Sequence, residues 1–149
     1  MSDQTKSNIA ATGISGLWVT PDDIENAPEA KGAYVLALRL SRVVHIGIPR
    51  VDQEQLMPGW YLYVGSANGS GGIRSRVRRH FRPSKKAHWH IDRLTVKAVE
   101  MAALAVPDGH ECELVRRLLR SRRYEVAIPG FGSTDCRYCE SHLLASLAS

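Results

Sequence analysis

The sequence predicts a small α/β protein in which helices pack against a sheet of mainly antiparallel strands. Runs of apolar and aromatic residues at 33–40, 43–46 and 60–64 have the length and composition of strands. The segments 71–81 and 111–120 read as helices and follow the strand-like runs along the chain. Because only Ser41-Arg42 separates the first two runs, we expect them to form a hairpin, which is antiparallel by construction.

The first 30 residues predict a flexible polar arm, followed by one folded domain at 31–149. Within the arm, Gly16–Val19 predicts a short edge strand, and Thr20-Pro21-Asp22 predicts a turn or the start of a helix. A chain of 149 residues is long enough to bury the core of one domain. We therefore expect a single domain, and a monomer.

The domain begins with strands. Ala33–Leu40 is apolar on both faces, which predicts a strand inside a covered sheet, and Val43–Ile46 is its expected hairpin partner. Trp60–Val64 predicts a third strand. The helix at Gly71–Phe81 ends before Pro83, because proline disfavours helical geometry in the residue that precedes it.

The second half of the chain predicts shorter elements. A compact turn at His88–Asp92 precedes a strand within 94–106. The helix at Glu111–Arg120 directs Leu114 and Leu118 toward the sheet. The remaining expected elements are a short strand at 124–128, a tight loop at 129–135 and a closing helix at 138–147.

The composition is that of a moderately basic globular protein, with 44% hydrophobic residues, 23% charged residues and a formal charge of +5. No run approaches the ~18 apolar residues that a membrane span requires. The N-terminus lacks the layout of a signal peptide. Three cysteines, an odd number, do not form a disulfide framework. These observations predict a cytoplasmic protein without a membrane-spanning segment.

The most informative segment is 59–82, where an apolar strand leads into a glycine-rich turn and then into an arginine-rich helix. Such a turn presents backbone N–H groups and the positive end of a helix dipole, which together bind anions. No Asp or Glu occurs from Gln55 to Ile91. The uncompensated charge favours a nucleic acid as ligand, and a solvated basic helix face is the alternative. The expected contact residues are Ser66, Asn68, Gly71, Gly72, Arg74, Arg78, Arg79, Arg82, Lys85, Lys86, His88 and His90.

Five blocks of residues occur in one characteristic order. They are Gly32-Ala33-Tyr34, the run Gly59–Ala67 that contains Tyr63-Val64-Gly65, the helix pair Arg76 and His80, the block His88–Asp92, and Gly130–Cys136. The whole set resembles the GIY-YIG nuclease superfamily, and within it the branch of Uri-type endonucleases. The resemblance covers about residues 31–144, and five blocks in one order are far more specific than any one of them.

The resemblance implies a three-stranded antiparallel sheet flanked by helices, and hydrolysis of DNA phosphodiester bonds with Mg²⁺ or Mn²⁺. It implies that Tyr34 and Tyr63 are paired active-site tyrosines, that Arg76 and His80 act from the helix, and that Glu113 binds the metal. The two tyrosine motifs lie farther apart here than is usual in the superfamily. The extra residues fit the strand at 43–46 and its loops, and the Uri-type branch shares this longer arrangement.

These residue types suit the hydrolysis of a phosphodiester. Arg76 can neutralise charge on the phosphate, and His80 can exchange a proton near neutral pH. Tyr34 could help to activate water if a nearby metal ion and Arg76 lower its pKa from ~10. Tyr63 would orient water or phosphate. Both tyrosines are equally compatible with core positions in which the hydroxyl is hydrogen-bonded.

Two carboxylates compete for the metal. Glu111 and Glu113 both begin the second long helix, and they point in directions about 200° apart around its axis. Only the resemblance selects Glu113. The alternative without a functional role is stabilisation of the helix N-terminus by acidic side chains, which is common.

A second metal is also conceivable from the cysteines. Cys112, Cys136, Cys139 and His142 offer the thiolate and imidazole donors of a structural zinc site. Buried free thiols are the favoured interpretation, because the donors come from separate elements that only the tertiary structure can bring together.

We therefore expect a metal-dependent DNA endonuclease that is selective for DNA structure rather than for sequence, and that acts in DNA repair or processing. A DNA-repair protein is a candidate partner, since the chain has no second DNA-recognition domain. The residues do not distinguish DNA from RNA. The alternative function is a non-catalytic nucleic-acid-binding module that retains the nuclease fold.

Overall fold

The computed structural model describes residues 3–46, 55–86, 89–131 and 140–147 of the chain. The elements run in the order α1 (Asp3–Ala10), β1 (Leu17–Val19), η1 (Pro21–Asn26), β2 (Gly32–Leu40), β3 (Val44–His45), β4 (Gln55–Leu56), β5 (Gly59–Ala67), α2 (Gly72–Phe81), α3 (Asp92–Thr95), β6 (Glu100–Pro107), α4 (Glu111–Arg120), β7 (Tyr124–Val126) and β8 (Leu143–Ser146). A six-stranded sheet has the order β1-β6-β2-β5-β8-β7, and every neighbouring pair in it is antiparallel.

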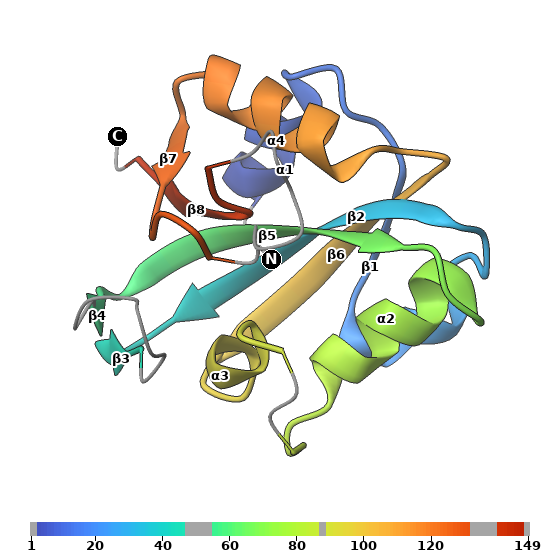
Figure 1. Cartoon of the computed structure of the whole chain (residues 1–149), viewed down its shortest axis with the longest axis horizontal. Coiled ribbons are helices and arrows are strands. Elements are labelled where there is room, and N and C mark those ends of the chain that lie inside the picture. The colour runs from blue at the N-terminus through green and yellow to red at the C-terminus, as the bar shows by residue number, and fades with distance from the viewer. Residues whose placement is uncertain (1–2, 47–54, 87–88, 132–139, 148–149) are drawn as a thin grey trace.

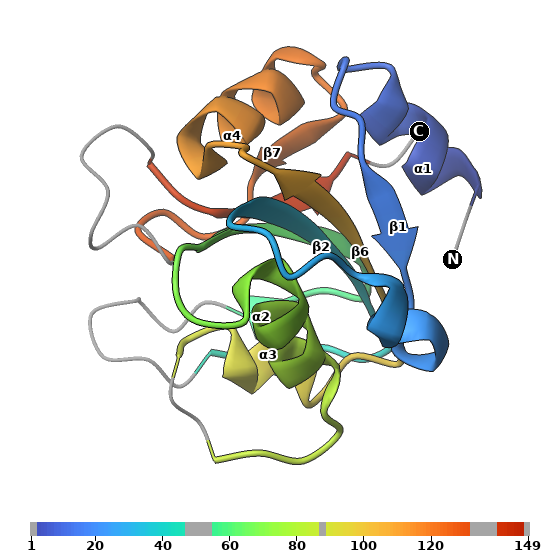
Figure 2. The same ribbon diagram turned by 90° about the vertical axis from the view of Figure 1, so that its right-hand side faces the viewer.

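Helices cover both faces of this sheet. α2 and α3 lie on one face and α1 and α4 on the other (Figure 1), and Figure 2 shows the same three layers from the side. Leu36 of β2 shares one core with Val77 of α2, while Val35 shares the opposite core with Leu118 of α4. The expected α/β class with an antiparallel sheet is confirmed. Within the described ranges, no helix is long and apolar enough to span a bilayer.

β2 is the central strand. It pairs with β5 along one edge and with β6 along the other. All of its residues except Arg39 are buried. A strand that is covered by helices on both faces must be apolar on both faces, which explains the continuous apolar run from Ala33.

The sheet is wider than the three strands that the resemblance implies, because β1 adds to β6, and β8 and β7 add beyond β5. The closing helix expected at 138–147 is wrong, since Leu143–Ser146 forms β8 and pairs with β5. Leu143 lies in one core and Leu144 in the other. A short apolar run that is buried on both faces has no periodicity that would distinguish a strand from a helix.

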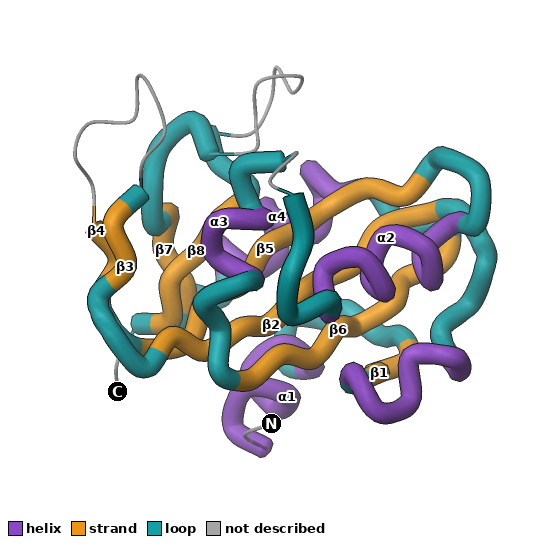
Figure 3. The backbone as a smooth tube through the Cα atoms, turned by 90° about the horizontal axis from the view of Figure 1, so that it is seen from below, coloured by secondary structure: helices purple, strands orange, loops and turns teal. Residues whose placement is uncertain are grey.

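The expected hairpin between Ala33–Leu40 and Val43–Ile46 is also wrong. Val44–His45 forms β3, which pairs with β4 in a separate two-stranded sheet. Both edges of β2 are already occupied by long partners, so a two-residue strand cannot compete for them. Figure 3 shows β3 and β4 at the end of the molecule away from α2.

The segment expected to be a flexible arm carries α1, β1 and η1. β1 pairs with β6, which matches the edge strand expected at Gly16–Val19. Ile9 and Val19 are almost completely buried. The segment therefore contributes to the core, because it gives β6 an outer neighbour and covers part of one face of the sheet.

The glycine-rich turn brings the start of α2 against the segment that precedes β2. Gly72 has a φ of 58°, and a Cβ at this position would clash with the carbonyl oxygen of Ala30. The close approach lets Ile73 N–H donate to Ala30 O and Arg74 N–H donate to Pro28 O, both at 2.9 Å. The amides of Ile73 and Arg74, which begin the helix after the turn, are thus already hydrogen-bonded within the protein. The turn serves the docking of α2.

Replacing Gly72 with alanine should therefore destabilise the fold. We expect Gly72→Ala to lower the free energy of unfolding by about 2 kcal/mol, because the new methyl group meets backbone and the left-handed φ is strained. Urea denaturation would measure the loss. Gly69→Ala is the matched control, since a Cβ at Gly69 enters open space. Equal losses in the two variants would contradict this account of the turn.

Candidate functional site

A buried hydrogen bond joins the first tyrosine motif to the arginine-rich helix. Tyr34 of β2 and His80 of α2 are 2% and 0% exposed, and the Tyr34 hydroxyl lies 2.7 Å from His80 Nε2. Gly65 of β5 faces Tyr34 in the strand register, and a Cβ at Gly65 would collide with the Tyr34 hydroxyl. The glycine of the Tyr-Val-Gly motif therefore makes room for the paired ring.

Aromatic rings surround the imidazole. The ring centroids of Tyr63 and Trp89 each lie 6.0 Å from that of His80. The guanidinium carbon of Arg76 lies 4.7 Å from the centre of the Trp89 ring, within the range of a cation–π contact. Tyr34, Tyr63, Arg76 and His80 are thus brought together as expected, and Trp89 joins them.

Burial keeps His80 neutral. It lowers the pKa of His80 to about 3, and the positive charge of Lys85 adds to the effect. Within the described part of the chain, Nδ1 of His80 has no hydrogen-bond partner. In the free protein His80 is therefore uncharged at neutral pH. A neutral imidazole can still accept a proton transiently.

Burial is also the largest influence on the pKa values of the two tyrosines. It raises the pKa of Tyr34 well above its ordinary value and the pKa of Tyr63 to about 12. The positive charge of Arg76 lowers both pKa values, and the negative charge of Glu111 raises them. The pKa of Tyr34 is not lowered in the free protein, because the effect of burial on this pKa outweighs that of the Arg76 charge. Both hydroxyls carry their protons at neutral pH.

The two competing carboxylates have different surroundings. Glu111 lies 3.5 Å from His142 Nδ1, and its charge acts on both tyrosines. Glu113 is half exposed and accepts a hydrogen bond of 3.0 Å from Arg117, one turn along α4. The helix therefore directs Glu111 toward the tyrosines and Glu113 toward solvent, although the resemblance selects Glu113.

Glu111 also belongs to a mixed cluster. One ligand atom from each of Glu111, Cys112 and His142 lies within 4.8 Å of the others. Cys112 and His142 are two of the four residues considered for zinc, and the fold brings them together. Cys136 and Cys139, the other two, lie outside the described residues.

Most of the arginines expected to contact nucleic acid have partners within the protein. Arg74 pairs with Glu29 at 2.7 Å, Arg78 with Glu25 at 2.6 Å, and Arg79 with Asp92 at 2.6 Å. These pairs fasten α2 to its neighbours, so the arginines serve the docking of the helix.

Of the other residues expected to contact nucleic acid, one is hydrogen-bonded to the end of α2 and several are exposed at the surface. Lys85 donates to the carbonyl oxygens of Arg79 and His80 at 2.7 and 2.8 Å, where α2 ends. Arg82, Lys86 and His90 are exposed. His88 lies outside the described residues.

Ser66 and Asn68 line a polar cleft of about 510 Å³ together with Lys31, His110 and Glu111. The cleft lies where β2 begins and where β5 and β6 end, as the pairing of Gly32 with both strands requires. The strand ends thus present Ser66 and Asn68 to the same opening as Glu111.

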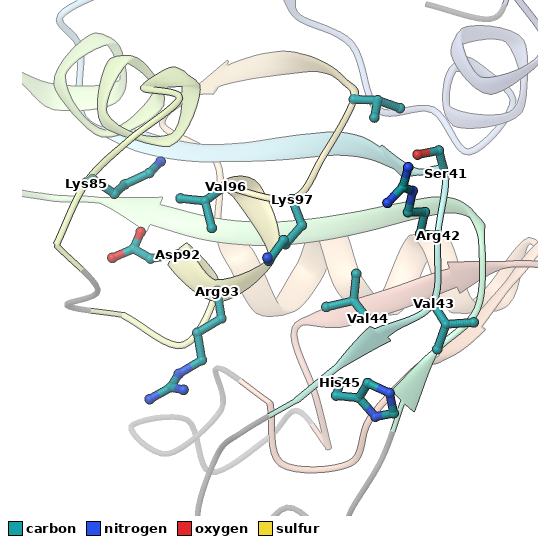
Figure 4. A pocket seen from close by; sticks show the side chains of 11 residues that line it. Ser41, Arg42, Val43, Val44, His45, Lys85, Asp92, Arg93, Val96 and Lys97 are labelled. Carbon is teal, nitrogen blue, oxygen red and sulfur yellow. The ribbon is translucent and has the colours of Figure 1, made fainter.

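The sequence reading missed a second cavity, of about 910 Å³. Figure 4 shows its side chains coming from the β2–β3 turn with β3, from the region of α3, and, for Lys85, from the segment after α2. Its basic residues are Arg42, His45, Lys85, Arg93 and Lys97, and the rest of its lining is formed by four valines, Ser41 and the acidic Asp92.

The burial of His80 predicts a stability that depends on pH. Its pKa falls from 6.5 to about 3 on folding, so the unfolded chain binds the extra proton. The contribution of the neutral imidazole to the free energy of unfolding is fully present above pH 6.5, and it is lost as the pH falls toward 3.

We expect this loss to reach about 2 kcal/mol by pH 5. His80→Gln cannot titrate, so its free energy of unfolding should fall less between pH 7 and pH 5. Chemical denaturation of both proteins across this range would measure the difference. If the free energies of unfolding of the two proteins fall equally between pH 7 and pH 5, the pKa of His80 is not lowered by folding.

Comparison with known protein families shows which family the chain belongs to. Residues 33–148 match the family described as Domain of unknown function DUF123, a span that runs from β2 to β8. No curated protein and no solved structure shows a significant match. The matched region contains Tyr34, His80 and the Glu111, Cys112 and His142 cluster. The chain therefore belongs to the DUF123 family.

Proposed function

We propose that the protein is a metal-dependent endonuclease of GIY-YIG type, closest to the Uri-type branch, that hydrolyses phosphodiester bonds in DNA. The observation that supports this most directly is the buried hydrogen bond between Tyr34 and His80, with Tyr63 and Arg76 around it. The sequence blocks of the nuclease superfamily converge on this one place.

Phosphodiester hydrolysis requires an activated water and a proton for the leaving oxygen. It also requires that the negative charge that develops on the phosphate oxygens is neutralised. Arg76 would supply the fixed positive charge, and its cation–π contact with Trp89 holds the guanidinium in place. No ion pair joins Arg76 to an acidic residue in the described ranges, so its charge is available to a phosphate.

Tyr34 would carry the proton. As its phenol oxygen takes a proton from the attacking water, its own proton passes to His80 Nε2, 2.7 Å away. Because burial lowers the pKa of His80 to about 3, the imidazolium formed is a strong acid. It releases the proton through Tyr34 to solvent, and the leaving oxygen, on the opposite side of the phosphorus, takes its proton from another water molecule. The low pKa that prevents His80 from holding a charge at rest thus favours the second transfer.

Glu111 would hold the divalent cation, Mg²⁺ or Mn²⁺, which when bound supplies positive charge to the phosphate and lowers the pKa of water. The fit rests on its surroundings, since Glu111 lines the polar cleft and acts electrostatically on both tyrosines. Glu113 fits less well, because Arg117 already engages its carboxylate.

The cavity beside α3 offers a surface for the DNA backbone. Its lysine and arginine side chains suit phosphates, and its apolar walls suit sugars and bases. Such contacts carry little sequence information, so we propose selectivity for DNA structure, with a role in repair or processing and a repair protein as a partner.

The choice between the two carboxylates is the sharpest test. We expect Glu111→Gln to reduce metal-dependent cleavage at least ~100-fold while DNA binding persists, because the variant loses the metal ligand and keeps its shape. Glu113→Gln should change cleavage little. The assay would use labelled duplex, single-stranded, nicked and branched DNA with Mg²⁺, Mn²⁺ or EDTA.

The same assay identifies the alternatives. If Glu113→Gln abolishes cleavage and Glu111→Gln does not, the carboxylate implied by the resemblance is the ligand. If the parent protein binds every substrate and cuts none, the protein is a non-catalytic nucleic-acid-binding module.

The cavity beside α3 also makes a measurable prediction. Each phosphate that a side chain neutralises contributes ~0.9 to the slope of log Kobs against log salt concentration for duplex DNA. The triple variant Arg42→Gln, Arg93→Gln and Lys97→Gln should lower this slope by about 2 to 3. Arg78→Gln is the control, since its guanidinium pairs with Glu25. A larger effect of the control would place the DNA on α2.

A further inference from the structure

We propose that Glu111, Cys112 and His142 form a binding site for a divalent transition-metal ion of the zinc type. Their ligand atoms lie within 4.8 Å of one another, and they supply one oxygen, one sulfur and one nitrogen donor. His142 is 2% exposed, and within the described residues its Nε2 has no hydrogen-bond partner. Among the described residues, the imidazole therefore has no strong hydrogen bond that would compete with a metal ion at Nδ1, the nitrogen nearer to Glu111.

The three donors come from rigid elements. His142 precedes β8, and its backbone is held on both sides: its N–H donates to Phe131 O at 2.9 Å, and its carbonyl accepts from Val64 N–H at 3.0 Å. Glu111 and Cys112 open α4, whose buried Leu118 fixes the helix against the sheet. Donors held in this way need little reorganisation to bind an ion.

The spacing of the donors fits a coordination shell better than it fits a hydrogen bond. Glu111 Oε2 and His142 Nδ1 are 3.5 Å apart, which is too long for a strong hydrogen bond. Ligands at bond lengths of 2.0 to 2.3 Å around a tetrahedral ion lie roughly 3.3 to 3.8 Å from one another. Small rotations of the Cys112 and Glu111 side chains would bring all three donors into this range.

The donor types select the class of metal. Magnesium prefers oxygen ligands, whereas thiolate and imidazole favour zinc, cobalt and related ions. A set with one sulfur, one nitrogen and one oxygen donor is therefore a poor magnesium site and a good zinc site. The fold brings these donors together from residues that are distant in sequence, because α4 and the segment before β8 both lie beside β5.

The site lies beside the proposed catalytic cleft, so its metal ion would take part in cleavage; this step rests on the proposed nuclease function. Glu111 borders the cleft lined by Ser66 and Asn68, and its charge acts on Tyr34 and Tyr63. The described residues supply three ligands beside an open cleft, an arrangement that catalytic zinc sites share. Of the two ions proposed for Glu111, this donor set selects Mn²⁺, or another transition-metal ion, over Mg²⁺.

Cobalt spectroscopy tests the site without any cleavage assay. The full chain, stripped of metal by a chelator, would be titrated with Co²⁺. We expect a thiolate-to-cobalt charge-transfer band in the near ultraviolet. Cys112→Ser should remove this band, and His142→Gln should weaken Co²⁺ binding at least ~10-fold. Glu125→Gln, an exposed carboxylate on β7, is the matched control and should bind like the parent protein.

Each outcome decides the proposal. No charge-transfer band with the parent protein, or a band that persists in Cys112→Ser, overturns the site. Because His142 is buried, circular dichroism must show that His142→Gln is folded, and Cys112→Ser carries the test if it is not. Cleavage with Mg²⁺ and no cobalt band would remove the site and keep the nuclease. A cobalt band without cleavage under any metal would keep the site and remove the nuclease.

Discussion

The hydrogen bond between Tyr34 and His80 is the contact around which the candidate site is built. It joins the central strand to α2 across a layer from which water is excluded, so both partners must be placed accurately. Gly65 leaves space for the tyrosine ring, and Gly72 lets the start of α2 approach the chain before β2. The conspicuous glycines of the sequence are explained by these two close approaches. Neither glycine needs a bound phosphate to account for it.

Burial has a second consequence, which is electrostatic. A low-polarity surrounding disfavours charge, so the imidazole and both phenols are neutral at rest. Fixed charge enters the region from Arg76 and Glu111, at the border of the buried zone. Neutral groups that exchange protons, placed among side chains of both charges, are suited to a reaction in which charge develops only during the chemical step. The remaining helix arginines pair with Glu25, Glu29 and Asp92 and stabilise the docking of α2.

The start of α4 shows how a difference of two residues changes the chemistry. Successive positions on a helix differ in direction by about 100°, so Glu111 and Glu113 face opposite sides. The packing of Leu114 and Leu118 against the sheet sets the rotation of the helix, and with it the carboxylate that reaches the cleft. The same rotation places Cys112 near His142. One helix orientation thus decides both the metal-binding residues and their distance from the tyrosines.

The sequence by itself determined the α/β class, the central strand, the two long helices and the set of residues that gathers around His80. Apolar runs and helical spacing are local signals, and the nuclease-like blocks are specific in their order. Only the tertiary structure decided that Val44–His45 leaves β2 for β4, that Leu143–Ser146 is a strand, and that Glu111 rather than Glu113 faces the tyrosines. Competition for sheet edges, burial from both faces and helix rotation depend on contacts between distant segments, and a linear pattern does not contain them.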